Sequence, residues 1–328
     1  MIQFSDKKSV GYVAAKQSVA FAFPRVGVIR AKGSDTLDLL NRLSTNELLK
    51  LQPNQGARTV LTSDKGRVVD VLTVIVNNTG ALLLCSDNNE QNVVSWLRKY
   101  TIMDDCKVYS TVNDYFALEI LGPEAAGLIA ELSGETLLDI PMSHWRNVTV
   151  FGESALLLRQ PAMCEFSFLL LFDSSQKDAI HARCEELSTE VPIMTDEDYE
   201  ILRIEAGMGV FGSELSDAYN PLEAGLLHLV NFKKGCYIGQ EIIARLDSYN
   251  KVKQRIMGFT SATEIPVGGE IKVDNNVVGK ITSSVLSPEF GWIALGYIRG
   301  EHTHPQSVVS VESGDDAVEA VIVGLPFE

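Results

Sequence analysis

The sequence predicts an α+β protein that ends in a separate all-β module. In the N-terminal three quarters of the chain, strand-like runs rich in β-branched residues alternate irregularly with helical segments, without an internal repeat. From Lys253 onward, short apolar runs are separated by turn residues such as Gly268 and Gly269. We therefore divide the chain into an N-terminal region, residues 1–248, and a C-terminal β domain, residues 249–328.

Strands are expected in the N-terminal region where apolar and β-branched residues run together. These runs are Val26–Ile29, Val68–Val76, Ala81–Cys85, Phe116–Leu121 and Ser167–Phe172. Two helices can be placed from their capping residues. Pro123 suits the first turn of a helix that Gly134 can end in a left-handed conformation. Thr195 can cap a second helix, in which Asp198 completes an approximate capping box and Gly207 marks the end.

The composition is that of a packed globular protein. The chain has 328 residues, of which 45% are hydrophobic and 22% are charged, so it differs from disordered and collagen-like chains. Its formal net charge of −15 opposes the phosphate backbone of nucleic acids and the surface of anionic membranes. We therefore expect no direct nucleic-acid or membrane partner, and an anionic ligand would need a local group of basic residues.

The cysteines indicate a reducing compartment. Their number, 5, is odd, and they lack the dense spacing of a disulfide framework. They form no C-x-x-C pair, so we expect no metal or iron–sulfur cluster site made by this chain alone. Charged residues interrupt the apolar residues near the N-terminus, and no apolar run is long enough to span a bilayer. We expect a cytoplasmic location.

The most informative segment runs from Lys233 to Glu241. Two glycines, Gly235 and Gly239, bracket Cys236 and Tyr237 just before a helical pattern. A helix N-terminus and neighbouring lysines both favour the thiolate form of a cysteine, so Cys236 is the best candidate for a reactive thiol. The alternative is a small buried thiol in a tight turn, and the residues alone leave both open.

Basic residues gather around this segment. Between positions 233 and 255 the chain holds six basic and two acidic residues, in contrast to its acidic average. Such a stretch suits a small molecule that carries carboxylates, whereas the alternative is a solvated helix face. The basic residues are Lys233, Lys234, Arg245, Lys251, Lys253 and Arg255.

The same segment resembles the K-G-C-Y-x-G-Q-E signature of the YgfZ-type folate-binding proteins, which are relatives of the glycine cleavage T-protein, an aminomethyltransferase. The matching positions are Lys234, Gly235, Cys236, Tyr237, Gly239, Gln240 and Glu241. Segments 43–47, 65–70, 203–207, 220–226, 279–288 and 293–298 also resemble this family. The resemblance covers most of the chain.

This resemblance implies a fold and a function. The fold would be a GcvT-like folate-binding fold, with interleaved α+β subdomains, one of them ferredoxin-like, around a tetrahydrofolate cavity and with a C-terminal β-barrel. The function would be that of a tetrahydrofolate-binding accessory protein for iron–sulfur cluster assembly or repair. Its partners would be folate, or a one-carbon derivative of it, and iron–sulfur proteins or assembly factors, and it would support tRNA modification indirectly.

The resemblance and the basic stretch together indicate the site residues. Cys236 and Asp70 are expected to be catalytic. Asp70 interrupts an apolar strand, where a carboxylate costs free energy unless it faces a polar cavity or solvent. Glu165 could bind the pterin, although a surface carboxylate at the entry of a strand is equally compatible with its position. The expected folate-binding residues are Glu165, Arg203, Glu205, Asn46, Arg245 and Lys253.

Two departures from the T-proteins leave other hypotheses open. T-proteins carry a pair of acids where this chain has Asp70 and Val71, and half of a second acidic feature is missing around Glu165. These departures weaken a second hypothesis, a one-carbon transferase that uses Asp70 to position or protonate a folate nitrogen. A third hypothesis is a non-catalytic module that only binds folate.

Overall fold

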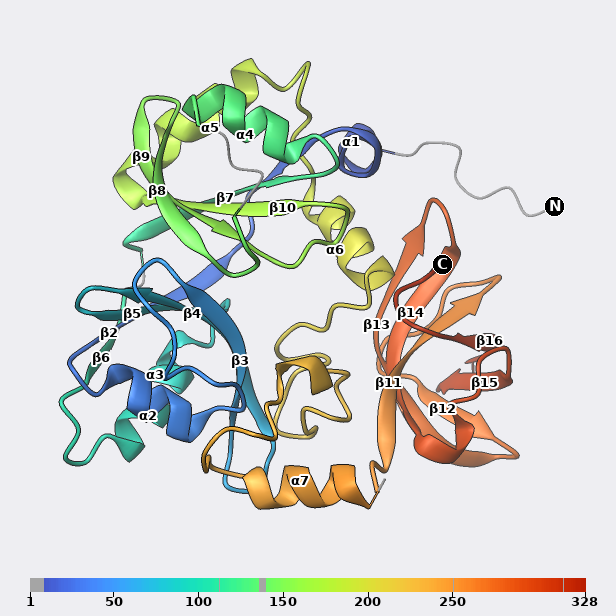
Figure 1. The fold of residues 1–328 in the computed structure, drawn as a ribbon. Coiled ribbons are helices and arrows are strands. Elements are labelled where there is room, and N and C mark those ends of the chain that lie inside the picture. Colours follow the sequence, from blue (N-terminus) through green and yellow to red (C-terminus); the bar gives the residue numbers. More distant parts are fainter. Residues whose placement is uncertain (1–8, 112, 136–139, 250, 315) are drawn as a thin grey trace.

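The computed structural model describes residues 9–111, 113–135, 140–249, 251–314 and 316–328. Its strands form two five-stranded antiparallel sheets and one closed barrel. Figure 1 shows the two sheets one above the other, with the barrel beside them. The predicted α+β fold with a C-terminal β-barrel is confirmed.

The first sheet, drawn lower in Figure 1, has the strand order β3-β4-β5-β2-β6. Its strands are β2 (Val26–Lys32), β3 (Gly56–Thr62), β4 (Val68–Asn77), β5 (Gly80–Ser86) and β6 (Lys107–Ser110). Helices α2 (Thr36–Leu43) and α3 (Glu90–Tyr100) cover one face, because their apolar residues, among them Leu39 and Leu97, join the core of this sheet.

The second sheet has the strand order β1-β7-β10-β9-β8. Its strands are β1 (Ala20–Ala22), β7 (Tyr115–Leu121), β8 (Trp145–Val150), β9 (Glu153–Arg159) and β10 (Ser167–Asp173). Helices α4 (Ala125–Ser133) and α5 (Lys177–Glu186) cover one face of it through buried residues such as Ile129 and Ile180. Each sheet is therefore a half-covered layer with one apolar face left over.

These remaining faces meet each other. Val28 of the first sheet and Leu171 of the second lie in one buried cluster. Leu84 and Leu169 belong to the same cluster and also reach the wall of a cavity. The cavity thus lies at the edge of the contact between the two sheets.

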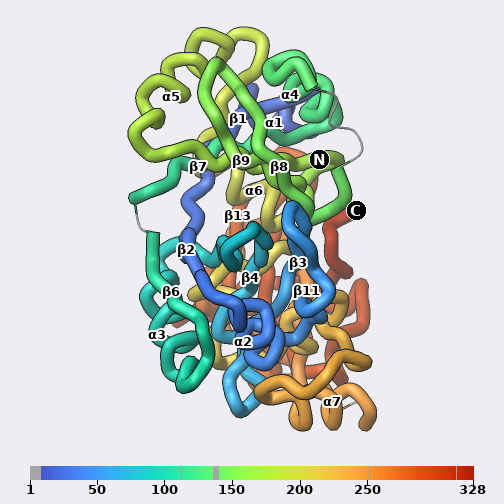
Figure 2. The backbone as a smooth tube through the Cα atoms, turned by 60° about the vertical axis from the view of Figure 1, so that its left-hand side comes forward, coloured from blue at the N-terminus to red at the C-terminus, as the bar shows by residue number. Residues whose placement is uncertain are grey.

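The C-terminal barrel has the strand order β11-β14-β13-β12-β15-β16. Its strands are β11 (Gln254–Ser261), β12 (Glu270–Val273), β13 (Asn276–Ser287), β14 (Gly291–Arg299), β15 (Val308–Ser313) and β16 (Asp316–Val323). Helix α6 (Asp196–Glu205) contacts β13 and also helix α1 (Val10–Gln17). In Figure 2 the barrel lies behind the two stacked layers.

Both helices predicted from capping residues are present, but α4 begins at Ala125, so Pro123 lies before the helix and not in its first turn. Gly134 ends α4 in the left-handed conformation, with a φ of 71°. The Thr195 hydroxyl accepts a hydrogen bond from the backbone N–H of Asp198, and the Asp198 carboxylate accepts one from that of Thr195. The predicted domain boundary after residue 248 falls between α7 (Gln240–Ser248) and β11. Across the described residues, no helix has the length and apolar character needed to cross a membrane.

Candidate functional site

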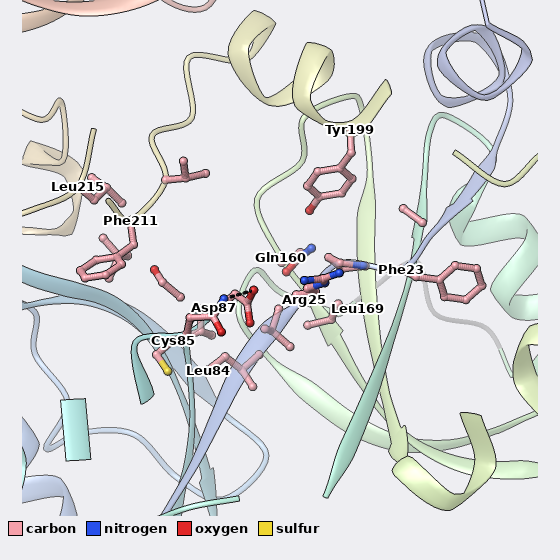
Figure 3. A pocket seen from close by; sticks show the side chains of 18 of the residues that line it. Phe23, Arg25, Leu84, Cys85, Asp87, Gln160, Leu169, Tyr199, Phe211 and Leu215 are labelled. Atoms are coloured by element: carbon pink, nitrogen blue, oxygen red, sulfur yellow. Dashed lines mark hydrogen bonds between the residues drawn. The ribbon is translucent and has the colours of Figure 1, made fainter. Parts of the chain in front are cut away.

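A cavity of about 730 Å³ lies between the two sheets, beside the first turn of α6. The connection from β1 to β2, strands β3, β4, β5 and β10, and segment 209–215 supply its wall (Figure 3). The polar and charged residues on this wall are Arg25, Arg58, Thr73, Ser86, Asp87, Asn88, Gln160, Thr195, Asp196 and Tyr199. Polar and apolar groups that line one concave space can form a site for a small organic ligand.

Two arginines on this wall have no partner within the described part of the chain. Arg25 follows Pro24 at the entry to β2, and its side chain projects into the cavity in Figure 3. Arg58 lies on β3, where burial lowers the pKa of its guanidinium. No hydrogen bond or ion pair joins either guanidinium to a described residue. Arg25 is exposed, whereas Arg58 is partly buried, and a partly buried guanidinium without a counter-ion costs free energy. The two positions together favour an anionic ligand.

Other polar groups on the wall are fixed by hydrogen bonds. Asn88 donates to the Asp87 carboxylate at 2.7 Å, and Gln160 donates to the Ser167 hydroxyl at 3.1 Å. The Tyr199 hydroxyl donates to buried Glu119 at 2.8 Å, and burial raises the pKa of Tyr199 well above its usual range. These groups are therefore held in place before any ligand binds.

Asp70 does not face this cavity. Its side chain is 0% exposed and its carboxylate accepts four hydrogen bonds, from the backbone N–H of Val71 at 2.7 Å, the backbone N–H and hydroxyl of Ser86 at 3.1 and 2.7 Å, and the Asn89 amide at 2.9 Å. Burial raises the pKa of Asp70, and these hydrogen bonds oppose that shift. The expectation that Asp70 points into a polar cavity is wrong, because its position on β4 turns the side chain toward the loop after β5.

The segment from Lys233 to Glu241 lies away from the cavity, at the C-terminal end of α2. The Lys234 ammonium donates to the backbone carbonyls of Asn41 at 2.6 Å, Ser44 at 2.8 Å and Asn46 at 2.6 Å. These carbonyls end α2 or follow it, and a helix leaves its last carbonyls without internal partners. Lys234 therefore acts as a side-chain cap, and burial lowers its pKa to about 8.

The rest of this segment is shaped mainly by packing. Gly239 has a φ of 80°, and a Cβ there would lie 2.5 Å from the Ser63 carbonyl oxygen, so only glycine fits. Tyr237 is 6% exposed and packs against Ile243 of α7. Cys236 is exposed, and it is not among the described residues that line the cavity. The thiol is therefore accessible, but its catalytic role stays a prediction.

Arg203 and Glu205 of α6 are used to join parts of the chain. Arg203 is 4% exposed and donates to the carboxylate of Glu214 at 3.2 Å and to the hydroxyl of Ser283 at 2.7 Å. Glu205 is 6% exposed and accepts hydrogen bonds from the hydroxyls of Tyr12 and Ser287 and from the ammonium of Lys16. These contacts connect α6 to α1 and to the barrel, and neither residue is among those described on the cavity wall.

The other expected folate-binding residues are dispersed. Glu165, Arg245 and Lys253 are exposed, and none of them belongs to the described lining of the cavity. Asn46 lies beside the cavity, in a neighbouring pocket that it shares with Arg58. The structure thus brings only Asn46 close to the cavity, and the folate-binding roles of the whole set stay predictions.

Two sequence models of known domains match this chain. The GCVT N-terminal domain matches residues 14–234, and the glycine cleavage T-protein C-terminal barrel domain matches residues 254–327. The chain belongs to the glycine cleavage T-protein family. Aminomethyltransferases of this family use tetrahydrofolate as their cofactor.

Individual relatives support this family assignment. An aminomethyltransferase of Thermoanaerobacter pseudethanolicus is 25% identical over 333 residues, which cover 99% of this chain and 90% of the relative. A chloroplastic protein of Arabidopsis thaliana, named only provisionally as a transferase, is 27% identical over 92% of this chain and 69% of its own length. The glycine cleavage system aminomethyltransferase T of Bartonella henselae has the same fold, with a TM-score of 0.84 over 97% of this chain and 88% of that chain at 19% identity.

One position on β4 separates this chain from the pattern of the T-proteins. Successive side chains on a strand point to opposite faces, so Asp70 faces the loop after β5 while Val71 faces the cavity. The pair of acids that T-proteins carry here would place one acid on the cavity wall. In this chain that place is apolar, and the acids on the described wall are Asp87 and Asp196 instead.

The sequence contained a signal for one residue that our reasoning missed. Arg58 is a charged residue in the otherwise uncharged strand Gly56–Thr62, and the argument applied to Asp70 would have singled it out. Arg25, Asp87, Gln160 and Asp196 lie in connections or at an element end, where a charged or amide residue is ordinary. Only the fold brings these residues together.

Proposed function

We propose that this protein binds tetrahydrofolate or a one-carbon derivative of it in the cavity between the two sheets, and transfers a one-carbon unit as an aminomethyltransferase-like enzyme. The observation that carries the proposal is the presence of Arg25 and Arg58 on the cavity wall without a described partner. Tetrahydrofolate ends in carboxylates, and the guanidinium group binds carboxylates in a geometry that forms two parallel hydrogen bonds.

The remaining wall suits the rest of this ligand. Val71, Leu84, Leu169 and Met194 supply an apolar surface for the pterin and the aminobenzoyl ring. Asp87 is a hydrogen-bond acceptor for the donor edge of the pterin. The volume of about 730 Å³ lies within the range of cavities that enclose cofactor-sized ligands. The polar and apolar groups of the cavity therefore fit tetrahydrofolate.

Binding is tested by anaerobic calorimetric titration with tetrahydrofolate. We expect a dissociation constant in the micromolar range, about −8 kcal/mol. Arg25→Gln and Arg58→Gln should each weaken binding about tenfold, because each removes a charged hydrogen-bond donor from a partly desolvated site. Arg183→Gln is the matched control, since Arg183 pairs with Glu186 on the surface of α5. If no reduced folate binds at millimolar concentration, the proposal is wrong.

Transfer is tested separately from binding. On a thiol carrier, the ¹³C-labelled carbon of an aminomethyl group should move to the folate as a methylene group between two of its nitrogens, with release of ammonia and of the free thiol. NMR follows the label. Asp196→Asn should slow this transfer and leave folate affinity within about threefold, if this acid on the wall moves a proton in the reaction. Asp87→Asn should weaken folate binding as well, because Asp87 accepts hydrogen bonds from the pterin. A wild-type protein that binds folate and transfers no label would be a folate-binding module, the alternative that Val71 favours.

The iron–sulfur accessory role stays a separate proposal, which rests on the resemblance of Lys234–Glu241 to the YgfZ-type signature. The exposure of Cys236 supports it, because a thiol must be accessible to react with a partner. Cys236→Ser should then abolish support of iron–sulfur enzymes in cells and leave folate affinity unchanged. Full support by this variant would contradict the role. A cytoplasmic location likewise stays a prediction.

A further inference from the structure

The contact between the two sheets also opens at the end away from the cavity. Along β2, Val26 lines the cavity, Val28 lies in the buried cluster between the sheets, and Arg30 lines a second pocket of about 200 Å³. Alternate residues of a strand point to the same face, so these three side chains follow one another along one face of the sheet. Strand β4 has the same order, from Thr73 on the cavity wall to Asn77 in the second pocket. We refer to this second pocket as the distal pocket.

Both sheets contribute side chains to the distal pocket. The first sheet supplies two cations, Arg30 and Lys32 of β2, and the second supplies two aromatic residues, Tyr115 of β7 and Trp145 of β8. The Arg30 guanidinium donates a hydrogen bond to the Tyr115 hydroxyl at 2.7 Å, and this bond joins the two sheets. The indole N–H of Trp145 donates to the Val76 carbonyl at 3.0 Å. The guanidinium and both rings are therefore held in place before any ligand binds.

The charge of the distal pocket is positive. Arginine and lysine side chains both carry a full charge at neutral pH. Arg30 and Lys32 form no ion pair with a described residue, and none of the described lining residues is acidic. The described groups beside the Arg30 guanidinium are the hydroxyls of Tyr115 and Tyr109, which are uncharged. Two cations that are two residues apart on one strand face repel each other, and an anion between them would relieve this repulsion.

The neutral polar groups of the distal pocket also present hydrogen-bond donors. The Asn77 side-chain oxygen accepts from the backbone N–H and the hydroxyl of Thr79 at 2.9 and 3.0 Å, so the amide N–H groups of Asn77 are left for a ligand. The Tyr115 oxygen accepts from Arg30, so its own O–H is left as a donor. Charge and hydrogen-bond polarity therefore favour the same kind of ligand, one that is anionic and accepts hydrogen bonds.

We infer that the distal pocket binds a small carboxylate that carries a flat apolar group. The carboxylate would lie between Arg30 and Lys32, within reach of the Asn77 amide, because a guanidinium and a carboxylate are both planar and match in geometry. The flat group would pack against Trp145 and Leu82. The volume of about 200 Å³ is below the range of about 300–1,000 Å³ that is typical for drug-sized ligands, so this ligand is smaller than a folate. The inference does not depend on the proposed folate function.

Benzoate is a suitable probe, and its neutral analogue benzamide is the control for charge. With 5-fluorotryptophan in the protein, ¹⁹F NMR reports on Trp145, which is not among the described residues on the cavity wall, and Trp145→Phe assigns its signal. At constant ionic strength, benzoate should shift this signal with a dissociation constant of about 1 mM, as a fragment-sized ligand gives. Benzamide should leave the signal in place. An unmoved signal at about ten times that benzoate concentration, or an equal shift with benzamide, would overturn the inference.

Acetate tests the flat apolar group of the proposed ligand. It carries the same charge as benzoate and lacks the ring, so it loses the contact with Trp145 and Leu82. We expect acetate to bind at least about fivefold more weakly than benzoate. Equal affinities for acetate and benzoate would contradict the ligand class that we infer.

Charge variants locate the binding. Lys32→Gln should weaken benzoate binding about fivefold, and it is the cleaner test because Lys32 is exposed and its side chain makes no described hydrogen bond. Arg30→Gln should weaken binding further, although it also removes the contact with Tyr115. Lys280→Gln is the matched control, since Lys280 is an exposed lysine on strand β13 of the barrel, and it should leave benzoate binding unchanged. Equal losses with Lys32→Gln and Lys280→Gln, or no loss with either distal-pocket variant, would overturn the inference.

Discussion

The central cavity and the segment from Lys233 to Glu241 use their charged residues in opposite ways. In the segment, Lys234 donates hydrogen bonds to three backbone carbonyls at the end of α2, so its hydrogen-bond donors find partners within the protein. In the cavity, Arg25 and Arg58 have no described partner, and Arg58 is partly buried while Arg25 is exposed. The first arrangement stabilises the fold, whereas the second favours an anionic ligand.

This difference shows why a distinctive motif need not mark a binding site. The segment has unusual residues because its left-handed turn against Ser63 accepts only a glycine, Gly239, and because Lys234 must reach three carbonyls at once. The cavity is built from residues that are ordinary in sequence and become unusual only in their surroundings. Exposed Cys236 is the part of the segment that these packing constraints leave unexplained.

The largest expected effect concerns Lys234. Lys234→Met removes the donor to three carbonyls around the end of α2 and should lower the free energy of unfolding by about 3 kcal/mol. Folate affinity per folded molecule should stay within about threefold, because the ammonium lies outside the cavity. Urea unfolding measures the first quantity and calorimetry the second. A variant of normal stability that binds no folate would reverse the roles we assign to the two regions.

Substitution of Asp70, like that of Lys234, should lower the stability of the fold, whereas substitution of the cavity arginines should lower folate affinity. In Asp70→Asn, one carboxylate oxygen becomes an amide group that must face the backbone N–H of either Val71 or Ser86. We expect a loss of about 2 kcal/mol in the free energy of unfolding. Thermal unfolding in the absence of folate measures this loss. If stability is unchanged while folate turnover disappears, Asp70 is catalytic after all.

The pH dependence of the free energy of unfolding should reveal the lowered pKa of the buried Lys234 ammonium. The pKa of Lys234 falls to about 8 in the folded protein, below the value of about 10.4 in an unfolded chain. Between these values the unfolded state holds more protons, so the contribution of Lys234 to the free energy of unfolding rises with pH, by up to about 3 kcal/mol. The difference in stability between the wild type and Lys234→Met should therefore grow from pH 7.5 to pH 10. A difference that shrinks over this range would show that the ammonium stays charged.

Substitution of Cys236 should have the smallest effect on both the free energy of unfolding and folate affinity. Because its side chain is exposed, Cys236→Ser should change the free energy of unfolding by less than about 0.5 kcal/mol and leave folate affinity unchanged. Its thiol should also react with an alkylating reagent before buried Cys85, whose pKa is raised by burial, and before buried Cys184. Mass mapping after brief alkylation shows the order. Faster modification of either buried cysteine would mean that the chain opens where we describe it as packed.

The sequence predicted the elements of the fold better than the site. Strand β4 and the caps of α4 and α6 depend on residues close together in the chain, so local patterns were sufficient to find them. Asp70 was placed on the correct strand, but a one-residue step along a strand exchanges the two faces, and pattern alone did not show that Val71 faces the cavity. Arg25 and Gln160 meet only because two sheets pack face to face, which no local pattern contains.

The most direct test of this account compares the wild type with Arg25→Gln/Arg58→Gln in urea unfolding, with and without tetrahydrofolate. Without ligand, we expect the double variant to be as stable as the wild type or more stable, since it lacks two unpaired charges. At 100 times the dissociation constant, folate should stabilise the wild type by about 2.7 kcal/mol and the double variant by much less. A double variant that is less stable without ligand, and equally stabilised by folate, would contradict the claim that these arginines are reserved for the ligand.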